Sequence, residues 1–182
     1  MRQLCVVFAL TLAAGCSNSN GLADPTAPNA ERTETLYALV GTSVGTPSAY
    51  AIEGARRIRT DLSVDFDFAY NVQTDGSHVL LPRNALGIEA ATTVNPGLMP
   101  RTESFEAIRT AVSNGYTTDR AVPIAVGERY LVRSRVTCAI GVPKYAKLEV
   151  LAFDDVARTI TFRILIDDNC GFRDLEPGLP KS

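Results

Sequence analysis

Side chains suited to nucleophilic or acid–base catalysis are scarce in this chain of 182 residues. A Ser-His-Asp or Cys-His arrangement would need His78, the only histidine, which follows a turn glycine and belongs to no recognised motif. Asp65 and Asp67 stand two residues apart, about 7 Å in an extended strand, a spacing that suits the paired carboxylates of glycoside hydrolysis. Carboxylates with this spacing more commonly lie on the solvated face of a half-buried strand and have no catalytic role. We therefore predict no catalytic residue and no enzyme, with a carboxylate-dependent hydrolase as the last alternative.

Arginine side chains offer a second kind of chemistry. Arg133 and Arg135 share a strand face by their spacing, and their guanidinium forks suit a carboxylate or a phosphate. Pairing with acidic side chains of a neighbouring strand is the simpler interpretation. We keep Arg133, Arg135, Asp65 and Asp67 as candidate ligand-binding residues. A single histidine and the lack of any CxxC spacing predict no metal site, and nothing in the sequence implies a cofactor.

Two of the four cysteines lie in the C-terminal half of the chain. Cys138 directly follows a predicted strand over residues 129–137, and Cys170 comes four residues after another over residues 159–166. In an antiparallel meander of three strands, the end of the first strand lies near the end of the third. An even pair of cysteines in an exported domain is typical of a disulfide. We predict that Cys138 and Cys170 are bonded.

The N-terminus is organised like a secretory signal. One positive charge precedes an apolar run over residues 4–14, which is too short for the roughly 20 residues of a transmembrane helix but suits a signal peptide. Small residues then lead to Cys16. This pattern resembles the lipobox of bacterial lipoproteins, with Leu12 one place further back than the ideal; an ordinary secretory signal is the alternative. The resemblance implies cleavage after residue 15, acylation of the Cys16 thiol and anchoring to a membrane. Because Ser17 replaces the aspartate that retains such proteins at an inner membrane, it also implies the outer membrane in a cell with two membranes.

Composition divides the rest of the chain into a tether and a domain. Residues 16–34 are poor in apolar side chains and rich in Ser, Asn, Pro and Ala, which is typical of a flexible tether. We expect one β-rich domain over residues 35–182. Loss of Arg2 with the signal leaves 17 basic and 20 acidic side chains, a net charge of −3. Without a basic excess, the sequence gives no support for nucleic-acid binding.

Alternation of apolar and polar residues predicts several strands. It is clearest over residues 62–72, where every second side chain is apolar and would face the same side. Other strands are expected over residues 36–42, 48–53, 78–81, 129–137, 145–153 and 159–166. In the last hairpin, pairing the apolar faces places Leu148 opposite Ile164, Val150 opposite Phe162 and Glu149 opposite Arg163.

One segment has the pattern of a helix. Thr102 can cap it, and Phe105, Ile108 and Val112 recur at helical spacing before Asn114 and Gly115 end it. The helix would be about ten residues long, so it would depend on packing. Strands with frequent turns and one short α-helix predict an all-β fold, an antiparallel β-sandwich or open barrel.

A family resemblance covers about a third of the chain. The order LVRS, YAKLEVLAFD and RTITFRI over residues 131–164 resembles the C-terminal strands of the HmuY-like haem-binding lipoproteins, and DFDFAYNV is similar to their early aromatic strand. The resemblance implies the fold. That family binds haem iron through a pair of histidines, and this chain has one, so haem binding is not carried over. The ending NCGFRDLEPGLP is similar to that of uncharacterised bacterial lipoproteins, which implies no activity.

These observations favour a lipid-anchored, non-enzymatic β domain that binds a ligand or partner in the cell envelope. Its partners would be the membrane, through the N-terminal lipid, and an unknown envelope protein or small ligand. A haemophore-like small-molecule binder is the first alternative.

Overall fold

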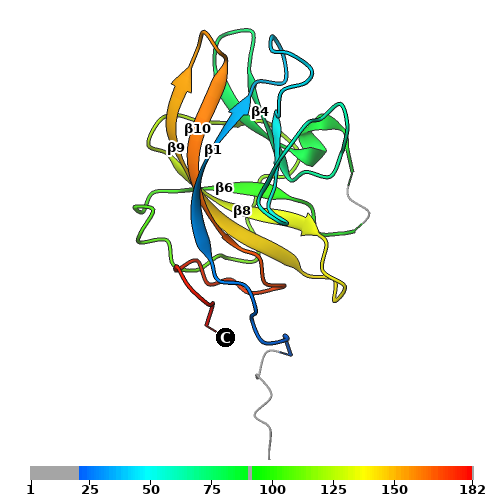
Figure 1. The fold of residues 1–182 in the computed structure, drawn as a ribbon, viewed down its shortest axis with the longest axis vertical. Coiled ribbons are helices and arrows are strands. Elements are labelled where there is room, and N and C mark those ends of the chain that lie inside the picture. Colours follow the sequence, from blue (N-terminus) through cyan, green and yellow to red (C-terminus); the bar gives the residue numbers. More distant parts are fainter. Residues whose placement is uncertain (1–20, 90–91, 182) are drawn as a thin grey trace, which may run out of the picture.

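Two antiparallel sheets of five strands each form a β-sandwich in the computed structural model, which describes residues 21–89 and 92–181 (Figure 1). The predicted fold class is confirmed, and the sheets do not close into a barrel. The first sheet has the order β1-β10-β9-β8-β6, with bounds Ala30–Tyr37, Thr159–Asp167, Pro143–Asp154, Arg129–Val136 and Gly97–Arg101. The second has the order β3-β2-β4-β5-β7, with bounds Arg56–Ile58, Ala49–Ala51, Phe68–Val72, His78–Pro82 and Val122–Pro123. A 3₁₀ turn, η1, spans Arg83–Leu86. Across the described ranges, no helix is long and apolar enough to span a membrane.

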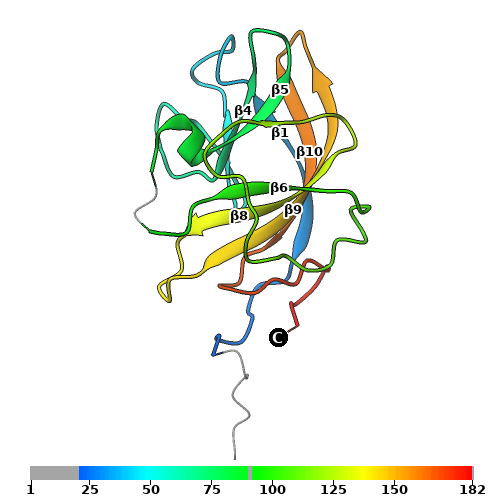
Figure 2. The ribbon, with the colours of Figure 1, turned by 180° about the vertical axis from the view of Figure 1, so that it is seen from behind.

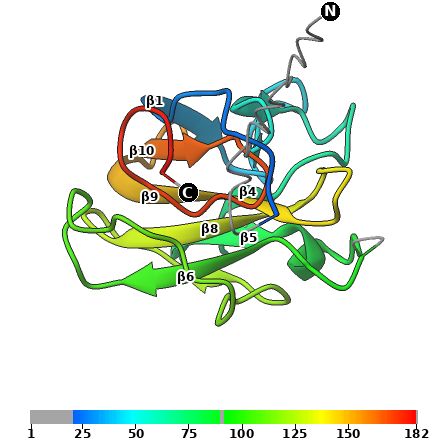
Figure 3. The same cartoon turned by 90° about the horizontal axis from the view of Figure 1, so that it is seen from below.

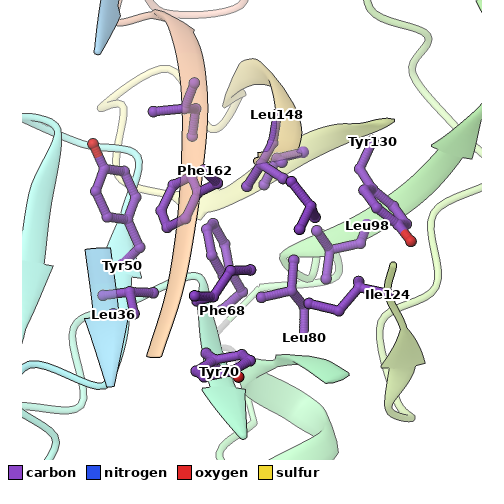
Figure 4. Close-up of a cluster of buried hydrophobic side chains, with 14 of the residues drawn as sticks. Leu36, Tyr50, Phe68, Tyr70, Leu80, Leu98, Ile124, Tyr130, Leu148 and Phe162 are labelled. Carbon is purple, nitrogen blue, oxygen red and sulfur yellow. The ribbon is translucent and has the colours of Figure 1, made fainter. Parts of the chain in front are cut away.

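The core lies between the two sheets and is rich in aromatic side chains (Figure 4). Tyr50, Phe68 and Phe162 meet there, with Tyr50 and Phe68 stacked and Phe162 edge-on to both. Leu148 of β9 and Leu80 of β5 extend the same cluster. Burial of such large apolar side chains is the main contribution that holds the sheets together.

The β9–β10 hairpin has the predicted register. Leu148 lies opposite Ile164, Val150 opposite Phe162, and Glu149 opposite Arg163. On the outer face, Glu149 also accepts from Arg129 of β8, so one carboxylate joins three neighbouring strands. The alternation that predicted this pairing breaks at a bulge between Thr161 and Phe162, beyond which the pairing resumes with Thr161 opposite Ala152.

The strand predicted over residues 62–72 is wrong in its first half. Strand β4 begins only at Phe68, and Leu62 is 72% exposed. Phe66 packs in a separate small cluster with Ala69 and not in the main core. The reason is Asp67, which we expected on the solvated face but which is completely buried and accepts hydrogen bonds from other segments.

The predicted helix over residues 102–112 does not form; no α-helix is present in the described part of the chain. The segment makes a single turn, in which Ala107 and Ile108 donate to the carbonyl of Ser104. Its next backbone groups bond to the C-terminal segment, since Ala111 donates to Arg173 O and Leu175 donates to Arg109 O. Phe105, Ile108 and Ala111 are nevertheless buried on the outer face of the first sheet, so the apolar spacing reflects packing.

The start of the domain also differs from the prediction. Residues 30–34, expected in the tether, belong to β1, which pairs with β10 from Ala30 opposite Ile166 to Tyr37 opposite Thr159. The expected boundary at residue 35 therefore falls inside a strand. Low hydrophobicity indicated a tether, but an exposed edge strand has the same composition.

Both ends of the described chain lie at one end of the sandwich (Figures 1 and 3). Asn29, just before β1, exchanges two backbone hydrogen bonds with Gly178. The turns between β4 and β5 and between β9 and β10 lie at the opposite end (Figure 2). The loop over residues 38–48 lies at this end too. It is held beside the two turns because Arg158, in the β9–β10 turn, donates to Val40 O and Val72 O.

Candidate functional site

The predicted disulfide is present. Cys138 and Cys170 are bonded, with Cα atoms 5.8 Å apart and a sequence separation of 32. Cys138 follows β8 by two residues and Cys170 follows β10 by three. The bond therefore ties together the ends of two strands that are separated in the sheet by β9. We call this part of the sandwich, formed by residues 21–29, 138–142 and 167–172, the disulfide end.

The side chain of Asn169 attaches the N-terminal segment to the disulfide end. Its Oδ1 accepts from the backbone amides of Thr26, at 2.9 Å, and Ala27, at 3.1 Å. Its Nδ2 donates to Ala27 O and to Asp167 Oδ1. One carboxamide beside the disulfide thus satisfies several backbone groups of a segment that has no strand partner there.

Asp167 lies beneath this attachment and is completely buried. Its Oδ1 accepts from the amide and side chain of Asn169, but its Oδ2 has no hydrogen-bond partner among the described residues. Burial raises the pKa of the Asp167 carboxyl from 3.8 to about 6, against the opposing effect of the Asn169 hydrogen bonds. The fold therefore destabilises the ionised form of Asp167 relative to that of an ordinary aspartate.

A cavity of about 530 Å³ lies between the N-terminal segment and the disulfide. Its polar boundary consists of Asp24, Thr26, Asp168 and Asn169. The remaining lining residues are small or apolar: Gly21, Ala23, Ala139, Ile140, Cys170 and Phe172. The exposed surface of the lining is mostly apolar, and Ile140 is 60% exposed. This site was not predicted from the sequence. Its one signal is the run of polar residues 167–169 just before Cys170.

Two of the four predicted ligand-binding residues are joined in the structure. Asp67 Oδ1 accepts from the backbone amide of Arg135 at 2.7 Å and lies 3.4 Å from its Nη1, while Asp67 Oδ2 accepts from the amide of Ile52. Burial raises the pKa of the Asp67 carboxyl, and the Arg135 guanidinium opposes that shift. Arg135 also pairs with Glu53, which lies 4.0 Å from Lys144. This network connects the two sheets. Arg135 pairs with acidic side chains, as the simpler interpretation expected, but they lie before β4 and after β2 and not on a neighbouring strand of its own sheet.

The other two predicted residues lie elsewhere. Arg133 donates to the carbonyls of Asn95 and Ser113 and covers the ring of Tyr116, so its guanidinium supports two loops. A register shift after Arg133 separates it from Arg135. Asp65 is exposed in the loop before β4. The four residues therefore do not form one site.

His78 belongs to an aromatic cluster at the end opposite the disulfide end. Its Nδ1 lies 2.6 Å from the Tyr70 hydroxyl and its Nε2 lies 3.2 Å from Asp155 Oδ1. Its ring stacks on Phe153, with centroids 3.7 Å apart. Burial raises the pKa of Tyr70 to about 12. Both ring nitrogens of His78 are engaged, and the buried Tyr70 hydroxyl is not open to a substrate.

No family model matches the chain, and neither does any curated protein or solved structure.

Proposed function

We propose that this chain is an exported bacterial lipoprotein, anchored through lipid on Cys16, whose β-sandwich binds a ligand or partner in the cell envelope without catalysing a reaction. The observation that carries the proposal is the disulfide between Cys138 and Cys170. Disulfides persist in oxidising compartments and are rare in the cytosol. The disulfide and the lipobox-like N-terminus are independent features of the chain, and both favour export.

The arrangement of the ends supports an anchor. Residue 21 lies at the disulfide end, so a lipid five residues earlier would hold this end towards the membrane (Figure 1). The opposite end would then face away from it. That end exposes Val40, Val44 and Val156, which are 63%, 73% and 97% accessible, on two loops that Arg158 holds together. Exposed apolar side chains on neighbouring loops favour a protein or ligand contact there.

The engagement of the polar residues supports a role without catalysis. Asp67 and Arg135 satisfy each other and the backbone, and Arg133 is bonded to carbonyl groups. His78 has partners on both ring nitrogens. These groups stabilise the fold, and we assign none of them to a substrate. In a cell with two membranes, Ser17 favours the outer membrane as the location.

Replacement of the acylated cysteine tests the proposal. Cys16→Ser should abolish labelling by a palmitate analogue, and the protein should leave the membrane fraction or accumulate as precursor. Cys5→Ser is the matched control, because Cys5 lies in the expected signal and should leave labelling unchanged; both cysteines lie outside the described residues. Continued labelling and membrane retention of Cys16→Ser would show that the proposal is wrong.

A further inference from the structure

We infer that the cavity at the disulfide end holds one acyl chain of the lipid on Cys16. This inference rests on the proposed function, since it needs the acylated cysteine. It adds a binding site and a ligand class: a neutral, ester- or amide-linked acyl chain that belongs to the same molecule.

The size and lining of the cavity suit such a chain. Its volume of about 530 Å³ lies within the range of roughly 300–1,000 Å³ that is usual for ligand sites. Ala139, Ile140 and Phe172 supply apolar wall, and Ile140 leaves most of its side chain exposed in the structure. An exposed isoleucine beside an apolar-lined cavity is expected to gain burial when the cavity is filled.

The position of the cavity identifies the occupant. Gly21 is itself part of the wall, and Cys16 precedes it by only five residues. Five residues span at most roughly 17 Å, so a lipid on Cys16 is tethered within reach of the cavity. A ligand tethered at such short range has an effective concentration in the millimolar range, well above that of free lipid.

The lining of the cavity offers no cation to an anionic ligand. None of the described residues that line it is Lys or Arg, and the Asp168 carboxylate on its boundary is paired with Lys144 Nζ at 2.7 Å. A fatty-acid carboxylate or a phosphate headgroup would lose its hydration there without gaining a counter-charge, whereas an acyl chain in ester or amide linkage carries no charge. The neighbouring cavity of about 400 Å³ is different, because Arg109, Arg173 and Lys181 line it together with acidic residues.

The walls are fixed before any ligand binds. The disulfide holds Cys170 against the segment after β8, and Asn169 holds residues 26–27. Gly171 allows the N-terminal segment to approach closely, since a Cβ there would lie 3.0 Å from Leu22 Cδ2 and its φ is +80°. A preformed site loses little entropy on binding.

A competition experiment tests the inference on the mature chain. Two forms are compared, one acylated at Cys16 and one with Cys16→Ser, and the intact mass of each reports acylation independently of binding. The probe is a fluorescent monoacylglycerol, which is neutral. We expect saturable binding to the Cys16→Ser form and binding at least about tenfold weaker to the acylated form, whose own chain fills the cavity. Oleate should bind more weakly than the probe.

Substitutions locate the probe. In the Cys16→Ser chain, Ile140→Glu should weaken binding about tenfold by placing a charge at the cavity wall. Val126→Glu, at an exposed valine just before β8 and so at the other end of that strand from Cys138, is the matched control and should leave probe binding unchanged. Urea unfolding of both variants confirms that they fold. Equal binding to the acylated and Cys16→Ser forms, or no effect of Ile140→Glu, overturns the inference while the anchor stands. If the intact mass of the protein that carries Cys16 shows no lipid, the proposed function and the inference are overturned together.

Discussion

At the scale of single residues, buried polar side chains supply hydrogen bonds where the chain leaves regular structure. Asp67 bonds to backbone amides of Ile52 and Arg135, and Asn169 bonds to those of Thr26 and Ala27. All these partners except Ile52 are more than 60 residues distant in sequence. The alternation of apolar and polar residues predicted Asp67 on the solvated face. Alternation indicates only the side of the strand on which a side chain lies, and it carries no information about a hydrogen bond to a distant amide. Such roles follow from the tertiary structure and could not be predicted.

Asp167 makes stability depend on pH. Its folded-state pKa of about 6 exceeds the ordinary value of 3.8, so the folded state binds more protons than the unfolded state between these values. The free energy of unfolding should therefore decrease as pH rises from about 4 to 6. Above that range Asp167 is ionised in both states, and the whole loss of stability from its ionisation remains. Asp167→Asn removes the titration. We expect the variant to be more stable than the parent by about 1–2 kcal/mol at pH 8, less than the pKa shift alone implies because the new amide also lacks a partner.

Urea unfolding at pH 4, 6 and 8 measures this difference. The gain of Asp167→Asn over the parent should be smallest at pH 4 and largest at pH 8. Asp65→Asn makes the same chemical change at an exposed carboxylate and should follow the parent throughout. A gain that is the same at all three pH values would refute the assignment of the titration to Asp167.

At the scale of elements, the sequence was informative where pairing is local. The β8, β9 and β10 strands follow one another, and the parity of their apolar faces determined the register of Glu149 opposite Arg163. The segment over residues 102–113 shows the limit. Its apolar spacing is real, but after a single turn its backbone hydrogen bonds go to residues 173–175, and helical spacing alone cannot reveal such a partner.

Lys147 should determine how firmly this segment is held. Its side chain is only 3% exposed, its Nζ donates to Ile108 O at 2.9 Å, and it lies 4.6 Å from the centre of the Phe105 ring. Burial lowers the pKa of the Lys147 amine. Lys147→Met keeps the apolar volume and removes the bond to Ile108. We expect faster amide exchange at residues 104–111 by about fivefold or more, as for loss of about 1 kcal/mol from one hydrogen bond.

Hydrogen exchange followed by peptide mapping measures this effect. The amides of β9 and β10 in the core should keep the protection of the parent, because Lys147 lies on the outer face of the sheet. Lys181→Met, at an exposed lysine near the C-terminus, is the control. Uniformly faster exchange over the whole domain would contradict a local role for Lys147.

At the scale of the whole molecule, the chain closes on itself at the disulfide end. Asn29 and Gly178 are bonded although nearly the whole domain separates them, and Asn169 joins the segment before Asn29 to the segment after β10. The sequence predicted the disulfide, because three consecutive strands determine where Cys138 and Cys170 lie. It did not predict that the first residues of the domain would pack beside that bond, since their polar composition resembles that of a tether.

The disulfide should therefore stabilise both the global fold and this end of it. Closing a loop of 32 residues contributes about 3–4 kcal/mol in the chain-entropy model. We expect the free energy of unfolding in urea to be lower by about that amount in the double variant Cys138→Ser and Cys170→Ser than in the parent. Since Asn169 is adjacent to Cys170, the double substitution should also speed amide exchange at Thr26 and Ala27, relative to the parent, by more than it does in β9. The parent protein should gain no maleimide at Cys138 or Cys170 when denatured without reductant and two after reduction, which checks the bond itself. Labelling at these positions before reduction, or a double variant as stable as the parent, would show that packing alone holds the two strand ends together.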